Sequence, residues 1–287
     1  MKSLIIGEIH ENAKELLSNA TDVSTTTNQL FMNGNSFPGF GVAVIRTFTK
    51  MGRPQLNKLP DIKYIVNCSV GTDNIDLDEL KKRNIKLISC EGTNSNSVAE
   101  HTVYLLMSLI RQDRIKPFFE LKNKTIGILG FGNIGKLVAK KLSGFDVNII
   151  AFDVIEQDKK VLEELNVKMK DIKQVVKESD VITVHIPFNI HTKEIINEDL
   201  FKLMKEKVFF INTSRSEVVD EEFLLKYINL GKFRGVGLDV YSELLKDELT
   251  NINGLNLVLT NHVAAQGEDS FENMCVSPMK ELLNNVI

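Results

Sequence analysis

Three glycines, Gly130, Gly132 and Gly135, follow a β-branched run and open a segment of helical character. In a Gly-x-Gly-x-x-Gly pattern the first glycine permits a tight turn, the second lets the backbone approach a pyrophosphate, and the third lets the helix pack on the strand. The unpaired N–H groups at the start of the helix favour an anion. Glycines also mark ordinary turns, so the strand before them and the helix after them carry the interpretation. Together they predict a dinucleotide-binding site.

An acidic residue stands where such a site needs one. Asp153 ends the next β-branched run, 18 residues beyond Gly135. A carboxylate at this place accepts hydrogen bonds from the adenosine ribose hydroxyls and repels a 2'-phosphate. The residues that follow, Val154 to Glu156, include no Arg to hold such a phosphate. The pattern favours NAD over NADP, and the alternative is a solvated Asp that caps the next helix.

Three titratable residues in the last third of the chain, Arg215, Glu243 and His262, each follow a strand-like run. Ligands bind at the carboxyl ends of the strands in an open parallel sheet, so these side chains are expected at one edge. A guanidinium can bind a 2-oxo acid and polarise its carbonyl, and an imidazolium can donate a proton as hydride arrives from a cofactor. A carboxylate can orient that imidazole and favour its charged form. Singly, each residue is explained as well by an ion pair, a loop carboxylate or a helix cap, so the prediction rests on the three together.

These groups need a framework of strands that end at a common edge. Short β-branched runs alternate with helix-length amphipathic segments along nearly the whole chain, which is typical of a parallel sheet with helical crossovers. Strands are expected at 4–6, 42–45, 64–67 and 86–89, and then at 125–129, 148–152, 181–184, 208–211, 235–238 and 257–259. The segment 97–111 is apolar almost all round, which predicts a helix buried between layers or domains. A last helix is expected over 268–286.

The sequence resembles the D-isomer-specific 2-hydroxyacid dehydrogenases over nearly its whole length. The motifs that carry the resemblance are Val70-Gly-Thr-Asp-Asn-Ile-Asp76, Asn94-Ser-Asn-Ser-Val-Ala-Glu100, the glycine pattern, His185-Ile-Pro187 with Thr192, Asn212-Thr-Ser-Arg215 with Val219-Asp220, Gly237-Leu-Asp-Val240 and Leu259-Thr-Asn-His262. So many motifs in one order are highly specific. The resemblance implies that Arg215, Glu243 and His262 are the catalytic set.

The resemblance also implies contacts that spacing alone does not single out. Backbone N–H groups around Val70 and Gly71 would hold the substrate carboxylate and assist Arg215. The cofactor would be contacted by residues of the glycine loop and of the strand ends that follow: Gly130, Gly132, Asn133, Ile134, Gly135, Asp153, Ile186, Pro187, Thr213 and Asp239.

The family topology divides the chain into two domains. It implies an α/β architecture of two doubly wound parallel-sheet domains, in which a Rossmann NAD-binding domain is inserted into a flavodoxin-like substrate domain. The NAD-binding domain would span residues 96–267, and the substrate domain would combine residues 1–95 with 268–287.

Three departures from the family pattern lie close to the expected catalytic set. The family usually reads Asp-Val-Phe-x-x-Glu-Pro, whereas here only Ser242 separates Asp239-Val-Tyr from Glu243, so the Glu arrives one residue early. A shortened loop can misaim the carboxylate, and activity would then fall most at high pH, where imidazolium is scarce. Asn261 stands where Pro normally precedes the His, and Ser216 where Gly normally follows the Arg.

Arg46, which follows the run 42–45, is the candidate for substrate selection. In some phosphoglycerate dehydrogenases a similar segment supplies a substrate-binding Arg, and a second cation suits a distal phosphate. A surface Arg at a strand end is the alternative. The expected substrate is 3-phosphoglycerate, with glyoxylate or hydroxypyruvate reduction close behind. A non-catalytic, NADH-sensing corepressor or scaffold is the competing class, since this fold is also used in that way.

Length and composition bound these interpretations. The chain has 287 residues and a formal net charge of -3, with 35 basic and 38 acidic side chains, so no surface for nucleic acid is expected. Its apolar runs are far shorter than the ~20 residues of a membrane span, and a cytoplasmic location is expected. Cys68, Cys90 and Cys275 form no CxxC pair, so we expect neither disulfides nor a metal site.

The segment 112–120 is brief where relatives carry a longer, Trp-containing arm that commonly helps to build a dimer, and this chain has no Trp. The expected partners are a small 2-oxo acid or 2-hydroxyacid and a second copy of the chain. From the length we also expect no C-terminal regulatory domain of the kind that some phosphoglycerate dehydrogenases carry.

Overall fold

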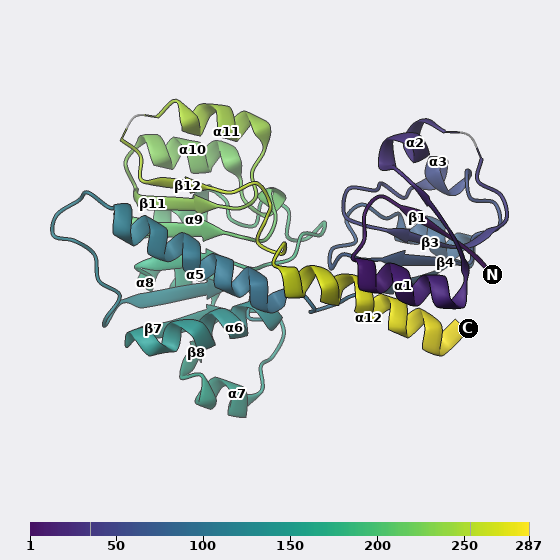
Figure 1. Ribbon diagram of the computed structural model, residues 1–287. Helices are drawn as coiled ribbons and strands as arrows, with labels where there is room; N and C mark the ends of the chain where they lie inside the picture. The colour runs from purple at the N-terminus through teal and green to yellow at the C-terminus, as the bar shows by residue number, and fades with distance from the viewer. Residues whose placement is uncertain (35, 253, 287) are drawn as a thin grey trace. The chain divides into compact units, whose positions relative to one another are not determined.

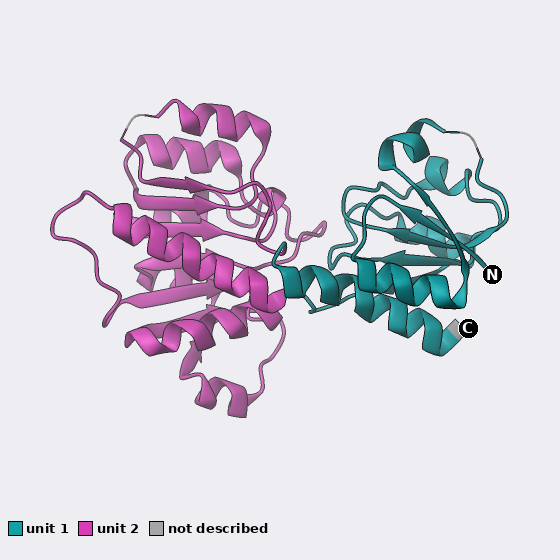
Figure 2. Cartoon of the chain, in the orientation of Figure 1, with its two compact units in different colours: residues 1–94, 266–287 teal, residues 95–265 magenta. Residues whose placement is uncertain are grey.

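The computed structural model describes all residues except 35, 253 and 287 and divides the chain into two compact units (Figure 2). Unit 1 combines residues 1–94 with 266–287, and unit 2 comprises residues 95–265. These bounds lie within two residues of the division expected from the sequence.

Unit 1 is built on a five-stranded sheet in the order β2-β1-β3-β4-β5, with every pairing parallel. Its elements are β1 (Lys2–Ile6), α1 (Glu11–Ala20), β2 (Asp22–Thr26), α2 (Asn28–Asn33), β3 (Phe40–Ile45), α3 (Arg53–Leu56), β4 (Tyr64–Asn67), α4 (Leu77–Lys82), β5 (Lys86–Ser89) and α12 (Glu268–Val286). Alternate strand residues face opposite sides of a sheet. One face therefore packs on α1 and α12, and the other on α2, α3 and α4. This is the strand order of flavodoxin-like domains.

Unit 2 is built on a seven-stranded parallel sheet in the order β12-β11-β10-β9-β6-β7-β8 (Figure 1). Its elements are α5 (Ser95–Gln112), β6 (Thr125–Leu129), α6 (Asn133–Leu142), η1 (Ser143–Phe145), β7 (Asn148–Phe152), α7 (Lys159–Glu164), β8 (Val167–Met169), α8 (Ile172–Glu178), β9 (Val181–Val184), α9 (Glu198–Leu203), β10 (Val208–Asn212), η2 (Ser216–Val218), α10 (Glu221–Asn229), β11 (Phe233–Leu238), α11 (Glu243–Thr250) and β12 (Leu257–Leu259). The order reverses at β6, as in a Rossmann sheet.

Two apolar cores cover the two faces of this sheet. Side chains of α8, α9, α10 and α11 fill one face, and side chains of α5 and α6 fill the other. The helix α5 packs closely on β11. A Cβ added at Gly237 of β11 would stand only 3.2 Å from the Cδ1 atom of Leu109 on α5. This close packing brings the polar residues of α5 to the ends of the neighbouring strands.

The predicted fold class is confirmed, with two strands added by the structure. The sequence missed β2 and β8, which lie at the edges of their sheets. β2 has only exposed and half-buried residues and β8 has three residues, so neither forms a clear apolar run. The helix expected from Ser97 begins at Ser95.

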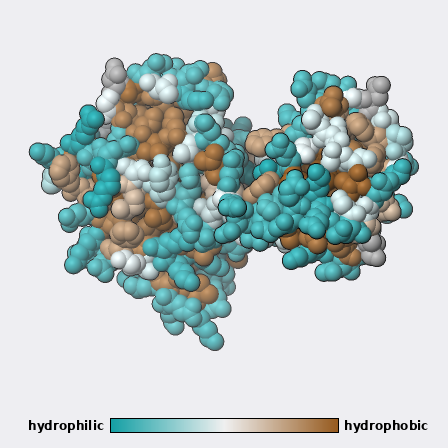
Figure 3. All heavy atoms as spheres, viewed as in Figure 1, coloured by the Kyte–Doolittle hydropathy of each residue, from teal (hydrophilic) through white to brown (hydrophobic). Residues whose placement is uncertain are grey.

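Polar side chains cover much of the visible surface of each unit (Figure 3). Apolar side chains gather on this face over the part of unit 2 where Figure 1 labels α10 and β12. Among the described residues, no helix is both long enough and apolar enough to cross a membrane.

Candidate active site

The glycine loop joins β6 to α6 at the carboxyl edge of the sheet of unit 2. Gly130 has a φ of +95°, and a Cβ there would stand 2.7 Å from the carbonyl carbon of His185. A Cβ at Gly135 would collide with the carbonyl oxygen of Gly130. By contrast, a Cβ at Gly132 would meet no atom within 4 Å. Two of these glycines are thus required by the fold, whereas Gly132 borders open space.

Gly132 is also the N-cap residue of α6, and no side chain caps this helix. The first N–H groups of α6, which include those of Asn133 and Ile134, therefore stand at an end with no side-chain acceptor. An open cradle at the positive end of a helix dipole fits the pyrophosphate of a dinucleotide. These residues fit the cofactor that the sequence predicts.

Asp153 lies between the glycine loop and the segment that follows β7. Its Oδ2 atom accepts a hydrogen bond from the N–H of Phe131 at 2.7 Å, and its Oδ1 atom accepts one from the N–H of Ile155 at 2.9 Å. A carboxylate has about four acceptor positions, so two remain for ribose hydroxyls. Asp153 therefore fixes the glycine loop and keeps acceptors for the cofactor.

His185, Ile186 and Pro187 follow β9, beside the glycine loop. The His185 imidazole is buried, and its Nδ1 atom lies 3.4 Å from the Oγ1 atom of Thr213. Burial lowers the pKa of His185 to about 3, which keeps the ring neutral. The hydroxyl of Thr213 also lies 3.0 Å from that of Thr102 on α5. The Thr213 side chain is thus engaged inside the protein, and the contacts of Ile186, Pro187 and Thr213 with the cofactor remain predictions.

Arg215 follows β10, and the side chain of Asn212 shapes the turn that presents it. The Oδ1 atom of Asn212 accepts hydrogen bonds from the N–H and the hydroxyl of Ser214, both at 3.0 Å, and its Nδ2 atom donates to the carbonyl of Arg215 at 2.9 Å. The Nη1 atom of Arg215 donates to the carbonyl of Ser214 at 2.8 Å. Arg215 is half-buried, and its role in binding the substrate remains a prediction.

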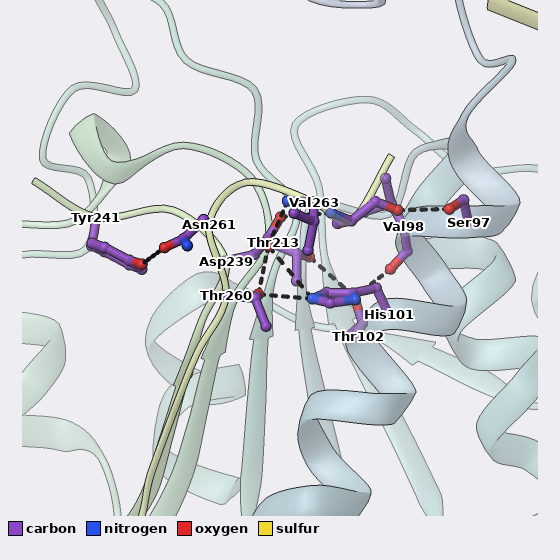
Figure 4. Close-up of polar contacts among 11 residues, drawn as sticks. Ser97, Val98, His101, Thr102, Thr213, Asp239, Tyr241, Thr260, Asn261 and Val263 are labelled. Atoms are coloured by element: carbon purple, nitrogen blue, oxygen red, sulfur yellow. Dashed lines mark hydrogen bonds and ion pairs between the residues drawn. The ribbon is translucent and has the colours of Figure 1, made fainter. Parts of the chain in front are cut away.

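His262 follows β12 in an exposed loop, with a φ of +52°. Its N–H donates to the carbonyl of Asp239 at 2.8 Å, which ties the loop to the end of β11. The carboxylate of Asp239 is fully buried and accepts hydrogen bonds from Thr260, Val263 and Ala264. Figure 4 shows this cluster beside α5. Since protein groups already occupy the Asp239 carboxylate, its contact with the cofactor remains a prediction.

Glu243 is placed differently from the other two members of the expected catalytic set. It is the first residue of α11, its side chain is 83% exposed, and its carboxylate lies 3.4 Å from the Nζ atom of Lys246. Asn261, the residue before His262, is bonded by Tyr241 and not by Glu243: the hydroxyl of Tyr241 donates to the Oδ1 atom of Asn261 at 2.6 Å. The role predicted for Glu243 as the partner of the imidazole thus has no support from its surroundings.

Val70, Gly71 and Arg46 belong to unit 1. The Nδ2 atom of Asn67 donates to the carbonyls of Ser69 and Gly71, both at 2.9 Å, and so shapes the turn after β4. Within the described part of the chain, the N–H groups of Val70 and Gly71 donate no hydrogen bond. They are therefore available to an anionic ligand.

The guanidinium of Arg46 lies over the ring of Phe271, 4.6 Å from its centroid. Its buried Nε atom has no hydrogen-bond partner among the described residues.

Sequence reasoning missed a different group of residues, His101 and Thr260, which lie beside Asp239 (Figure 4). A histidine within an otherwise apolar helix was the only signal for them. In the described part of the chain, no cluster of His, Cys, Asp and Glu is arranged to hold a metal ion.

Comparisons with known proteins agree with this geometry. Residues 95–264 match the sequence model for the NAD binding domain of D-isomer specific 2-hydroxyacid dehydrogenases. Hydroxypyruvate reductase of Thermotoga maritima is 30% identical over 278 residues, which cover 90% of this chain and 89% of that protein. D-3-phosphoglycerate dehydrogenase of Archaeoglobus fulgidus is 30% identical, and the match covers 99% of this chain but 57% of the relative.

The fold is also similar to that of a solved structure. D-lactate dehydrogenase from Aquifex aeolicus, in complex with NAD and lactic acid, matches 99% of this chain and 95% of its own, with a TM-score of 0.82 and 26% sequence identity. The similarity extends over both units.

Proposed function

This chain belongs to the D-isomer specific 2-hydroxyacid dehydrogenase family and is an NAD-dependent oxidoreductase. We propose that it interconverts a 2-oxo acid and the corresponding D-2-hydroxyacid, and that Arg215 and His262 carry out this reaction. The observation that carries the proposal is the position of these two residues. They follow β10 and β12, which flank β11, at the sheet edge that also carries the glycine loop.

NAD supplies hydride exchange when it is bound. The guanidinium of Arg215 offers paired N–H donors in a plane, which suit the carboxylate of a 2-oxo acid and polarise the adjacent carbonyl. The imidazolium of His262 donates its proton to the carbonyl oxygen during reduction and, once neutral, accepts the hydroxyl proton during oxidation. In this proposal the expected third member, Glu243, does not contact the imidazole.

We further propose that unit 1 supplies the substrate anion site. The free N–H groups of Val70 and Gly71 would bind the carboxylate, as anions are bound by turns of the backbone. Arg46 adds a cation whose buried Nε–H lacks a partner, and a buried unpaired donor is costly unless a ligand meets it. A second cation favours 3-phosphoglycerate as the substrate. Hydroxypyruvate or glyoxylate, which need only one cation, is the alternative.

A spectrophotometric assay tests the reaction. The wild-type chain should oxidise NADH in the presence of at least one 2-oxo acid from a panel that includes 3-phosphohydroxypyruvate, hydroxypyruvate, glyoxylate and pyruvate. His262→Gln should lower kcat at least about a hundredfold, because general acid catalysis contributes 10²–10⁴-fold. Tight NADH binding without turnover of any member would instead favour a sensor of the cofactor.

Arg46→Ala tests the choice of substrate. It should raise KM for 3-phosphohydroxypyruvate by roughly tenfold or more, since a charged hydrogen bond is worth about 1.5–3 kcal/mol. KM for glyoxylate should change by less than about twofold. Equal changes for both substrates would remove the phosphorylated substrate from the proposal.

We also propose a homodimer located in the cytoplasm. Tyr104 on α5 and Ile115 and Phe118 on the following connector expose 54%, 40% and 65% of their surface, and large exposed apolar side chains favour association. Sedimentation equilibrium should give twice the chain mass of 32.4 kDa. Arg234 holds this connector through an ion pair with the buried Asp113 at 2.6 Å.

A further inference from the structure

One buried carboxylate holds the loop that carries His262. The Oδ1 atom of Asp239 accepts hydrogen bonds from the hydroxyl of Thr260 at 2.5 Å and from the N–H of Val263 at 2.9 Å. Its Oδ2 atom accepts one from the N–H of Ala264 at 3.0 Å. The bonded residues therefore stand on both sides of His262, whose own N–H donates to the Asp239 carbonyl. Asp239 thus determines the path of the backbone through residues 260–264.

This arrangement keeps Asp239 ionised although it is buried. Burial opposes the charged form, but the nearby His101 ring and the hydrogen bonds from Thr260 and the two backbone N–H groups outweigh it and lower the pKa of the carboxyl. A carboxylate accepts stronger hydrogen bonds than a neutral group does. The loop is therefore attached to a fixed negative charge at the end of β11.

The helix α5 holds the same loop from the other side. The Nε2 atom of His101 lies 2.9 Å from the Oγ1 atom of Thr260 and 3.5 Å from Asp239 (Figure 4). Because the single hydroxyl proton of Thr260 is directed to Asp239, the His101 ring must donate from Nε2 to the Thr260 oxygen. One turn earlier, the hydroxyl of Ser97 donates to the carbonyl of Ala264 at 2.7 Å. Residues four apart share a helix face, so one face of α5 contacts both ends of the loop.

The conformation of His262 explains why the loop needs these contacts. A φ of +52° lies in the left-handed region, which is unfavourable for a residue with a side chain and persists only when the surroundings impose it. Without the contacts to Asp239 and α5, the backbone would relax and redirect the imidazole. A small misplacement of a reacting group costs a large part of the rate.

We propose that Asp239, Thr260 and His101 form a clamp that positions His262 for proton transfer. The inference rests on the proposed function, because it assigns the loop a catalytic histidine. The three clamp residues are positioning residues in this inference, since they act through His262. The clamp sets the backbone of the loop whatever partner the imidazole itself has.

The experiment compares Thr260→Val with Thr260→Ser. Valine keeps the shape of the side chain and removes the hydroxyl, whereas serine retains it. Thr260→Val should lower kcat roughly tenfold to a hundredfold, with the dissociation constant for NADH unchanged and the thermal midpoint lowered by only a few degrees, because one hydrogen bond to a buried charge is lost. Thr260→Ser should restore kcat to within about threefold of wild type. Thr250→Val is the matched control, because Thr250 is exposed on α11 and bonds only to its own helix; it should keep the wild-type kcat.

A second measurement does not depend on turnover. Hydrogen exchange at the N–H groups of Val263 and Ala264 should be at least about tenfold faster in Thr260→Val than in wild type, and unchanged in the Thr250 control. His101→Phe, which removes the ring donor, should reproduce the effect, and His101→Gln should reverse most of it.

The outcomes separate the inference from the proposed function. A wild-type chain that reduces no 2-oxo acid would refute the proposed function, while the exchange rates would still test the clamp. An active wild type would overturn the inference if Thr260→Val kept kcat within twofold, or if its loss of kcat came with weaker NADH binding or with loss of the folded state at the assay temperature. Unchanged exchange at Val263 and Ala264 would overturn it as well.

Discussion

The buried His185 is expected to make unit 2 less stable in mild acid, because the unfolded chain binds a proton at this ring that the folded chain excludes. The Nε2 atom of this ring has no hydrogen-bond partner in the described part of the chain, and burial lowers its pKa from 6.5 to about 3. Below about pH 6.5 the unfolded chain binds a proton at this side chain, whereas the folded chain stays neutral until about pH 3. Stability therefore falls as the pH drops through this window, by about 1.4 kcal/mol for each pH unit.

The expected loss between about pH 7 and about pH 5 is about 2 kcal/mol, which is a ~30-fold change in the unfolding equilibrium. This figure depends on the unfolded chain alone, because any folded pKa below about 4 leaves the native ring neutral at about pH 5. His185→Asn removes the titrating ring. The variant should lose about 2 kcal/mol less than wild type over the same interval, whatever its stability at neutral pH.

Urea unfolding followed by tyrosine fluorescence measures this difference. The chain has no Trp, and three of its four tyrosines, Tyr104, Tyr227 and Tyr241, belong to unit 2. The other histidines are present in both proteins and cancel in the comparison. Equal losses of stability in wild type and His185→Asn would refute the argument. So would a proton resonance of the His185 ring that titrates near pH 6.5 in the folded protein.

Three further predictions follow from local geometry. Gly132→Ala should weaken NADH binding at least about tenfold and change the free energy of unfolding by less than about 0.5 kcal/mol. The reason is that the added Cβ would occupy only the open space beside the start of α6 and would touch no protein atom. A large loss of stability in urea unfolding would contradict this prediction. Glu243→Gln should keep kcat within about threefold at every pH, because an exposed ion pair contributes little; a loss that grows with pH would show that this carboxylate supports the imidazolium. All three thiols are buried, so Ellman's reagent should react with them slowly in the folded protein and should detect all three once denaturant is added. Rapid labelling of one thiol without denaturant would contradict this burial. These thiols are Cys68, Cys90 and Cys275.

The fold could be predicted most clearly from the sequence where a strand is buried on both faces, although the edge strands β5 and β12 were also predicted. The central strands β6, β9 and β10 are continuous apolar runs, and such runs are visible without a structure. The edge strands β2 and β8 form few buried contacts, so their sequences carry no comparable signal. The register of the sheet and the closeness of α5 to β11 depend on packing and were accessible only from the structure.

The site could be predicted in part, for a similar reason. Arg215 and His262 could be proposed from the sequence because each follows a strand-like run, which is a local pattern, and their catalytic roles stay predictions. The contact between His101 and Thr260 joins residues 159 positions apart, and no local pattern announces it. Two of the cysteines show in the same way that contacts between distant residues cannot be predicted from local patterns. Cys68 and Cys275 come together in one core of unit 1, where the thiol of Cys68 faces the carbonyl of Cys275.

The displacement of Glu243 follows from the way α11 begins. Ser242 is the N-cap of this helix: its hydroxyl accepts a hydrogen bond from the N–H of Leu245 at 3.2 Å, and its own N–H donates to the carboxylate of Glu221 at 3.0 Å. With only one residue between Tyr241 and Glu243, the cap leaves Glu243 at the first helical position, where an acid is stabilised by the helix dipole and faces solvent. The Asp239 clamp uses the end of β11, the loop after β12 and α5, and none of these elements contains Glu243. The proposed clamp can therefore hold the loop of His262 without a contribution from Glu243, which is exposed at the start of α11.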